Sequence, residues 1–234
     1  MRFISEYLRD AGIGKDMKVI ISGGTGLIGR ALTSTLLHDG HSVCVLSRSI
    51  PVDGLITGAD YLHWGAETEE WHAAVDGVDA VVNLAGESIG SGRWTQSKKI
   101  QILQSRVQVG EMLADAVAQA KAKPAIFIQA SAVGIYGTGA DIVFNEQSPA
   151  GEGYLAEVAI QWEASTRAVE ELGVRRAVIR TGIVLDRQEG ALPQMLAPFR
   201  LGVGGPIGSG SQWMSWIHLE DEVQAILYIL TRQL

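Results

Sequence analysis

Residues 17–29 have the sequence MKVIISGGTGLIG, from Met17 to Gly29. The first six are mostly apolar and rich in β-branched side chains, which predicts a buried strand. Glycine then recurs at positions 23, 26 and 29, with the spacing G-x-x-G-x-x-G. Residues 27–38 follow with helical periodicity and end at Asp39-Gly40, a typical helix stop. The stretch therefore predicts a strand, a tight turn and a helix.

At each of the three motif positions, glycine is needed for a different physical reason. Gly23 permits a sharp exit from the strand, and Gly29 lets the helix pack closely on it. A side chain at Gly26 would hold a pyrophosphate away from the backbone, next to a helix N-terminus whose N–H groups and dipole favour anions. The motif predicts a dinucleotide site, with a purely structural turn as the alternative. Its predicted residues are Gly23, Thr25, Gly26, Leu27, Ile28 and Gly29.

Strands and helices alternate along the rest of the chain. We expect further strands at 42–47, 61–63, 79–84, 125–130 and 174–181, and further helices at 67–75, 95–121, 155–172, 192–200 and 220–230. This alternation predicts right-handed βαβ crossovers and an α/β, Rossmann-type doubly wound parallel sheet with helices on both faces. Ligands of such sheets bind at the carboxyl ends of the strands, so the residues that follow each strand are candidates for function.

The domain is expected to span residues 17–234, after an N-terminal extension, residues 1–16, with a short helix at 4–10. The glycine-rich stretch 202–210 is expected to be a loop. In the long helix 95–121, Thr95 is the expected cap. Its expected apolar stripe consists of Ile100, Leu103, Val107, Met112 and Leu113.

Composition limits the kinds of partner. The chain has 234 residues, 47% of them apolar, and a net charge of −7, which argues against nucleic acid or an anionic membrane surface. One cysteine, Cys44, excludes a disulfide framework and a Cys-rich metal site, and its apolar neighbours predict a buried thiol. The chain lacks a signal-peptide pattern and any run of roughly 18 apolar residues. We therefore expect a cytoplasmic protein that acts on a small molecule.

The end of the second strand predicts which dinucleotide is bound. An NAD site usually has Asp or Glu there to bind the ribose 2′-hydroxyl. Here the sequence is Ser47-Arg48-Ser49, and the first acid is Asp53. A guanidinium binds a 2′-phosphate with paired hydrogen bonds, so Ser47 and Arg48 predict NADP. The alternative is that Arg48 is a solvated loop charge.

The residues after the next two strands complete the predicted site. Leu84, Ala85 and Gly86 are small or apolar and can lie against the adenosine half of the cofactor, although an ordinary strand-to-loop turn has the same composition. His63 and Trp64 are candidates for the border of the adenine, with a plain core or surface Trp as the alternative.

The motifs beyond the glycine turn resemble a known family. They are NLAGESI, RWTQSKK, SRV, ASAVGIYG, RTGIVL, FRLGVGGPIGSGSQWMSWIH and Asp221, spread between about Met17 and Leu234. Together they resemble the extended, epimerase-like branch of the short-chain dehydrogenase/reductase superfamily, and within it the atypical "epimerase family" proteins. The resemblance implies a Rossmann-type fold, bound NADP and a substrate similar to a nucleotide sugar. It also implies that the chain holds parts of a substrate-side region, around 182–218, without the family's C-terminal lobe.

The catalytic unit implied by the resemblance is incomplete. That superfamily uses a Ser and a Tyr-x-x-x-Lys motif, in which Lys lowers the Tyr pKa from near 10. Ser131 and Tyr154 are the matching candidates. However, the residue four positions after Tyr154 is Val158, and the last lysine of the chain is Lys123. Neither Tyr154 nor Tyr136 can therefore have the usual Lys.

Other charged residues are candidates for the missing cation or for substrate contacts. Arg180 lies near the end of the predicted strand 174–181, and His218 precedes the predicted helix 220–230. Arg180 can instead pair with Glu163, and His218 can orient the last helix. Glu87 and Arg93 can meet a substrate or remain solvated charges. Two functions follow: an NADP-dependent epimerase or oxidoreductase acting on a nucleotide sugar or a similar carbonyl or hydroxyl compound, or a non-catalytic NADP-binding, redox-sensing module. By analogy with related folds, helix 95–121 is a candidate homodimer interface.

Overall fold

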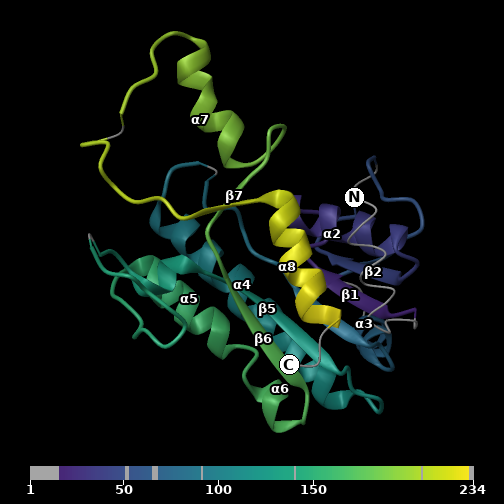
Figure 1. The fold of residues 1–234 in the computed structure, drawn as a ribbon. Coiled ribbons are helices and arrows are strands. Elements are labelled where there is room, and N and C mark those ends of the chain that lie inside the picture. The colour runs from purple at the N-terminus through teal and green to yellow at the C-terminus, as the bar shows by residue number, and fades with distance from the viewer. Residues whose placement is uncertain are drawn as a thin grey trace.

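A parallel six-stranded sheet forms the centre of the protein (Figure 1). The computed structural model describes residues 16–50, 53–64, 68–90, 92–139, 141–206 and 208–231. The strands are β1 (Lys18–Ser22), β2 (Ser42–Ser47), β3 (Asp60–His63), β4 (Ala80–Asn83), β5 (Ile126–Ala132) and β6 (Arg175–Thr181). Their order is β3-β2-β1-β4-β5-β6, and it reverses between β1 and β4. This is the predicted doubly wound arrangement.

Helices cover both faces of the sheet. They are α2 (Leu27–His38), α3 (Thr68–Val75), α4 (Gln96–Gln119), α5 (Tyr154–Ala164), α6 (Ala168–Glu171), α7 (Ala191–Arg200) and α8 (Leu219–Thr231), with a 3₁₀ turn, η1 (Val133–Tyr136). Except for 155–172, the predicted ranges that fall on described residues agree with these bounds to within two residues. The predicted helix 4–10 lies outside the described residues.

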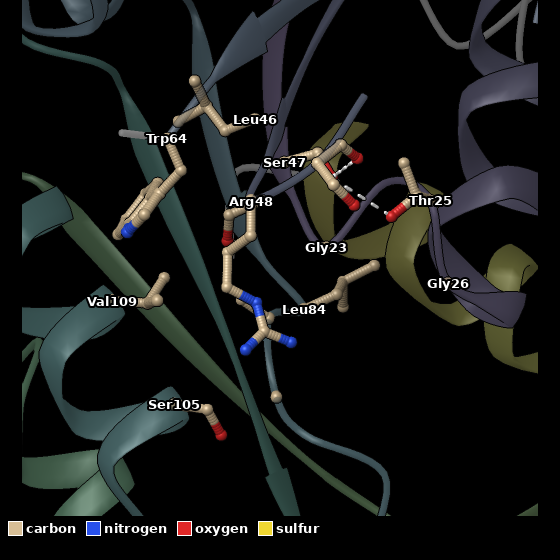
Figure 2. Close-up of a pocket in the computed structure, with 14 residues that line it drawn as sticks. Gly23, Thr25, Gly26, Leu46, Ser47, Arg48, Trp64, Leu84, Ser105 and Val109 are labelled. Atoms are coloured by element: carbon tan, nitrogen blue, oxygen red, sulfur yellow. Dashed lines mark hydrogen bonds between the residues drawn. The ribbon is translucent and has the colours of Figure 1, made fainter. Parts of the chain in front are cut away.

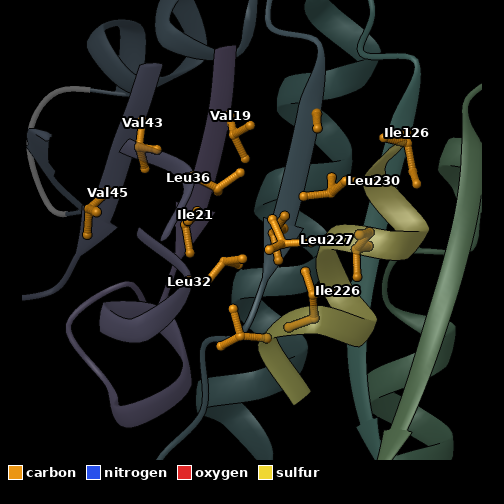
Figure 3. Close-up of a cluster of buried hydrophobic side chains, with 14 residues drawn as sticks. Val19, Ile21, Leu32, Leu36, Val43, Val45, Ile126, Ile226, Leu227 and Leu230 are labelled. Atoms are coloured by element: carbon orange, nitrogen blue, oxygen red, sulfur yellow. The ribbon is translucent and has the colours of Figure 1, made fainter. Parts of the chain in front are cut away.

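The first half of the core lies between the sheet and the pair α2 and α8 (Figure 3). Leu32 and Leu36 of α2 meet Ile21 of β1, and Ile226 and Leu227 of α8 complete the layer. The first and last described helices therefore pack side by side on one face of the central strands.

The second half of the core lies on the opposite face, against α3, α4 and α6. Successive side chains of a strand point to opposite faces, so Ile20 belongs to this cluster while its neighbour Ile21 belongs to the other. Phe127 of β5 packs here against apolar residues of α4 and α6. Burial on both faces explains why the strands are almost continuously apolar.

The predicted helix 155–172 is interrupted. It divides into α5 and α6, with a turn at residues 165–167. The Ser165 hydroxyl donates to the Trp162 carbonyl at 2.7 Å, and the buried Thr166 hydroxyl accepts from Arg176 Nε at 3.1 Å. Arg176 also donates to the Glu163 carbonyl. These side-chain bonds compete with the helical pattern, and they involve a strand residue that local periodicity does not detect.

The predicted apolar stripe of α4 was right in part, and its predicted cap was right. Thr95 accepts the Lys98 N–H at 3.2 Å, as expected for the cap. Of the five predicted stripe residues, Ile100 is 46% exposed, and only Leu113 is fully buried. The buried face instead includes Gly110, where a Cβ atom would lie 2.0 Å from Ser165 Oγ. The prediction used only large side chains, whereas the helix also packs closely through small ones.

A second, two-stranded parallel sheet was missed by the sequence analysis. Its strands are β7 (Ile183–Leu185) and β8 (Trp216–His218). Three residues are too few to show a period, and their pairing joins distant parts of the chain. Between them, α7 and the following loop extend away from the main sheet (Figure 1), and every residue of α7 is half-buried or exposed. Within the described ranges, no helix has the length and apolar character needed to cross a bilayer.

Candidate functional site

A cavity of about 210 Å³ lies where the strand order reverses. Its lining residues come from the carboxyl ends of β1, β2 and β4, with α4 as one wall. They are Ser22, Gly23, Thr25, Gly26, Leu46, Ser47, Arg48, Ser49, Trp64, Leu84, Ala85, Gly86, Ser105 and Val109. Most of the predicted cofactor residues therefore meet here, whereas Leu27, Ile28 and Gly29 lie behind them in the first turn of α2.

The three glycines of the G-x-x-G-x-x-G motif differ in the space around them. Gly23 has φ +76°, and a Cβ atom there would lie 2.7 Å from the Leu84 carbonyl carbon. At Gly29 it would lie 2.3 Å from the Gly23 carbonyl oxygen. At Gly26 the nearest atom is that same oxygen, at 3.3 Å. Two glycines thus permit close packing inside the protein, while Gly26 borders the cavity.

The N-terminus of α2 opens at this cavity. Its capping residue is Gly26, and within the described part of the chain no side chain caps this end. The first turn also has no acidic residue. The N–H groups and the positive end of the helix dipole are therefore available to an anion.

Arg48 crosses the cavity from the end of β2. Figure 2 shows its side chain between Trp64 and Leu84. Its Nη2 lies 3.2 Å from Oε2 of Glu87, which follows β4, and the side chain is 67% exposed. Ser47 beside it donates to the Ser49 carbonyl at 2.8 Å and lies 3.4 Å from the Thr25 hydroxyl. Arg48 thus lines the cavity and pairs with Glu87, while most of its side chain remains exposed to solvent.

Glu87 is held by two cations from different elements. Lys98 of α4 lies 2.7 Å from Glu87 Oε1, and Arg48 contacts the other oxygen. These hydrogen bonds, that of Lys98 first, lower the pKa of the Glu87 carboxyl below its usual value. Its backbone N–H also donates to Ser105 Oγ at 2.9 Å. Glu87 therefore joins β4, α4 and the end of β2 at the edge of the cavity.

A buried polar row beneath the cavity was not anticipated. Ser22, Asn83 and Gln129 are neighbours on β1, β4 and β5. Ser22 donates to Asn83 Oδ1 at 2.6 Å, and Asn83 Nδ2 donates to Gln129 Oε1 at 2.9 Å. Each of these polar residues directly follows an apolar run in the sequence. That pattern is the sequence signal that could have predicted the row.

Arg106 of α4 was also missed. It donates to the carbonyls of Glu87 and Ile102 at 3.0 and 2.9 Å, and its guanidinium lies 4.9 Å from the centre of the Trp162 ring. A Cβ atom at Gly86 would lie 2.9 Å from Arg106 Cζ. The small residue predicted at position 86 therefore makes room for this arginine.

The two predicted catalytic hydroxyls, of Ser131 and Tyr154, donate to different groups and not to each other. Ser131 donates to Glu163 Oε1 at 2.6 Å, whereas Tyr154 donates to the Lys99 carbonyl at 2.7 Å. Burial raises the pKa of Tyr154 above its usual value, and the nearby Arg106 charge opposes this only in part. Val158, four residues further along α5, is 5% exposed.

Arg180 makes the alternative contact predicted for it. Its Nε and Nη2 donate to the two oxygens of Glu163 at 2.8 and 3.0 Å, and its Nη1 donates to the Tyr136 hydroxyl at 2.9 Å. Burial alone would raise the pKa of Glu163, but the hydrogen bonds from Arg180 and Ser131 outweigh it and lower that pKa. His218 lies at the entry to α8, where its Nδ1 accepts the Glu220 N–H at 3.3 Å.

Two comparisons with known proteins, one with family models and one with curated sequences, both find epimerase families. The family model of the NAD dependent epimerase/dehydratase family matches residues 19–233. The Arabidopsis thaliana "Epimerase family protein SDR39U1 homolog, chloroplastic" is 42% identical over 92% of this chain and 62% of its own length.

Two solved structures are also similar. The crystal structure of human epimerase family protein SDR39U1 (isoform 2) with NADPH has a TM-score of 0.80 and 36% identity, over 92% of this chain and 70% of that one. The nucleoside-diphosphate sugar epimerase from Corynebacterium glutamicum has a TM-score of 0.79 and 33% identity, over 97% of this chain and 47% of that one. This chain thus spans between about half and about two thirds of the length of these relatives. Its sequence and fold place it in the NAD dependent epimerase/dehydratase family.

Proposed function

We propose that the protein binds NADP in the cavity between β1, β2 and β4, and uses it to act on a nucleotide sugar or a similar hydroxyl or carbonyl compound. The observation that carries this proposal is the uncapped N-terminus of α2 at a cavity that Arg48 crosses. When bound, the nicotinamide would accept or return a hydride.

Shape and charge support a separate place for each part of the cofactor. The pyrophosphate would lie on the first-turn N–H groups of α2, against Gly26. The adenosine half would lie among Trp64, Leu84 and Val109, which line the opposite wall. The cavity is smaller than the roughly 300–1,000 Å³ of typical ligand sites, so it accounts for part of a dinucleotide.

The preference for NADP over NAD rests on charge. The end of β2 supplies Ser47 and Arg48, and no carboxylate comes from residues 47–49. A human relative has been crystallised with NADPH. Arg48 is paired with Glu87, so a 2′-phosphate would have to replace that carboxylate or share the guanidinium with it.

The substrate class is proposed from the Corynebacterium relative, which is named a nucleoside-diphosphate sugar epimerase. The test is to incubate the protein with NADP or NADPH and a panel of nucleotide sugars, and to follow nicotinamide absorbance and the sugar products. Conversion of one sugar nucleotide into an epimer or an oxidised product would support the proposal. Tight NADPH binding with no product from any compound would contradict its catalytic part.

One observation favours a second candidate, a non-catalytic NADP-binding module that reports the redox state of the cofactor. Ser131 and Tyr154 donate their hydrogen bonds to separate groups, and the chain has no lysine after Lys123. Such a module would bind NADP and NADPH with different effects on its conformation. Identical hydrogen-exchange patterns with the two cofactors would exclude this candidate. A cytoplasmic location and a homodimer through α4 stay predictions.

A further inference from the structure

A second cavity, of about 360 Å³, lies beside the first. Its lining residues are Thr25, Arg30, Ser49, Asp53, Gly54 and Tyr61. Thr25 and Ser49 line both cavities, so the two meet at the end of β2. The first cavity contains Arg48 and the second contains Arg30. The end of β2 therefore lies between two guanidinium groups.

Arg30 is oriented by its own neighbours. It belongs to α2, and its Nη1 donates to the Thr25 carbonyl at 2.8 Å. Its Nη2 lies 2.5 Å from Oε2 of Glu189, in an ion pair whose side chains are 38% and 54% exposed. One side of the guanidinium is thus fixed to the glycine turn, and the other is satisfied by a carboxylate that solvent can reach.

Three residues that carry hydroxyl groups line the second cavity together with Arg30. Thr25, Ser49 and Tyr61 each contribute one to the cavity. The Tyr61 hydroxyl accepts the Ile56 N–H at 2.9 Å, so its own proton is free to be donated to an anion. The Asp53 carboxylate also lines the cavity and opposes an anion. A guanidinium with several hydroxyl donors is a typical setting for a phosphate group.

We propose that the 2′-phosphate of bound NADP lies at the end of β2, where it meets Arg48 from the first cavity, and reaches into the second cavity, where it replaces Glu189 on Arg30. The inference rests on the proposed binding of NADP in the first cavity, which would place the adenosine ribose over the end of β2. A phosphate carries more negative charge than a carboxylate and has three acceptor oxygens. It can therefore displace a half-exposed carboxylate that is held by a single ion pair.

Replacement of Glu189 by the phosphate would also affect the loop that contains Glu189. Glu189 lies in the loop between β7 and α7, where its N–H donates to Asp186 Oδ1 at 3.0 Å. In the same loop, a Cβ atom at Gly190 would lie 3.0 Å from Leu27 Cδ2, so this loop rests on the start of α2. Release of Glu189 removes the ion pair that joins the loop to α2. The phosphorylated cofactor would thus loosen the β7–α7 loop, and NAD would not.

The test compares NADPH and NADH affinities, by fluorescence titration, in four proteins: wild type, Arg30→Gln, Glu189→Gln and Glu171→Gln. Glu171 is an exposed acid of α6 and controls for the loss of one negative charge. Arg30→Gln should weaken NADPH by about tenfold to a hundredfold and change NADH by less than about twofold. Glu189→Gln should tighten NADPH by about twofold to fivefold, because the competing carboxylate is gone. Glu171→Gln should change neither.

The outcomes separate this inference from the proposed cofactor. If the wild type binds NADH as tightly as NADPH, the proposed NADP specificity fails. If the wild type prefers NADPH and Arg30→Gln keeps that preference, the exchange at Arg30 is wrong while NADP binding stands. Retained NADH affinity shows that Arg30→Gln is folded. Weaker NADPH binding by Glu189→Gln would also overturn the inference, because Glu189 would then support the phosphate. Hydrogen exchange at residues 186–190 should rise with NADPH and not with NADH.

Discussion

Arg48 and Glu87 form an ion pair at the edge of the first cavity, so the charge that would meet a 2′-phosphate is already balanced. Glu87 keeps a second partner, Lys98, and can remain ionised when Arg48 turns to a ligand. At the scale of single residues, the site is therefore a set of ion pairs that exchange partners. The sequence predicted Arg48 because it lies at a strand end, but its pairing depends on groups from two other elements.

The first prediction concerns this arginine. Arg48→Asp should weaken NADP by about 1.5–3 kcal/mol or more and NAD much less, because a charged hydrogen bond is lost and the new carboxylate repels the phosphate. Isothermal titration with both cofactors measures the difference. Arg93→Asp, which places the same change on an exposed loop, is the control. Equal losses for the two cofactors would show that Arg48 does not recognise the 2′-phosphate.

The second prediction concerns Tyr154. If its phenolate is the catalytic base, the rate of hydride transfer should be very low at pH 7 and rise as the pH increases. Burial raises the pKa of this tyrosine above its usual value of about 10, so the ionised fraction at pH 7 is below about one in a thousand. A pH–rate profile of the wild type and of Tyr154→Phe tests this. A flat wild-type profile, or one that Tyr154→Phe leaves unchanged, would mean that another group is the base.

The third prediction concerns Glu222, a residue that is 3% exposed and whose carboxylate accepts the Thr181 hydroxyl at 2.7 Å. Burial raises its pKa, so the folded state favours the protonated form. Its contribution to stability is full below the pKa of the unfolded chain and is lost as the pH rises through the folded pKa. Glu222→Gln should therefore raise the free energy of unfolding at pH 7, by about 1 kcal/mol. Urea unfolding should show this gain disappearing near pH 4. A constant gain at both pH values would indicate a packing effect.

At the scale of elements, α2 both packs against the glycine turn and opens its N-terminus to the cavity, and a different glycine permits each. Gly29 lets the helix touch the turn, and Gly26 leaves the helix end open to the cavity. Gly26 has φ −80° and ψ 175°, a conformation that other residues adopt easily. A substitution at position 26 can therefore change binding without changing the fold.

The fourth prediction follows from this separation. Gly26→Val should retain the fold and abolish NADPH binding, because its side chain occupies the space of the pyrophosphate. Gly29→Ala should instead destabilise the protein by about 1–3 kcal/mol or more, since its Cβ atom would overlap the Gly23 carbonyl. Thermal unfolding and NADPH titration of both variants distinguish the two effects. Wild-type affinity in a folded Gly26→Val protein would contradict the proposed phosphate site.

At the scale of the whole molecule, the parts that could be predicted are those that local pattern determines. The strand–turn–helix of residues 17–38 has apolar, glycine and helical signals within one short stretch. The break after α5 could not be predicted, because it depends on Arg176 of a later strand. The pairing of β7 with β8 and the contact of Gly110 with Ser165 are likewise long-range. In the site, strand-end positions were predictable, whereas the partners of Arg48, Ser131 and Arg180 required the fold.

The position of α8 has a consequence for how the protein is made. Ribosomes release the chain from its N-terminus, so β1, α2 and β4 emerge long before residues 219–231. Until then, the face that Ile226 and Leu227 cover stays open to water beside Ile21. Until α8 is made, part of the first half of the core therefore stays exposed, and exposed apolar surface of this kind promotes aggregation. The fifth prediction is that chains ending at His218 aggregate, whereas the 234-residue chain remains monodisperse or forms a defined oligomer in light scattering. A soluble chain that ends at His218 and shows a sharp unfolding transition would show that the sheet is stable without α8.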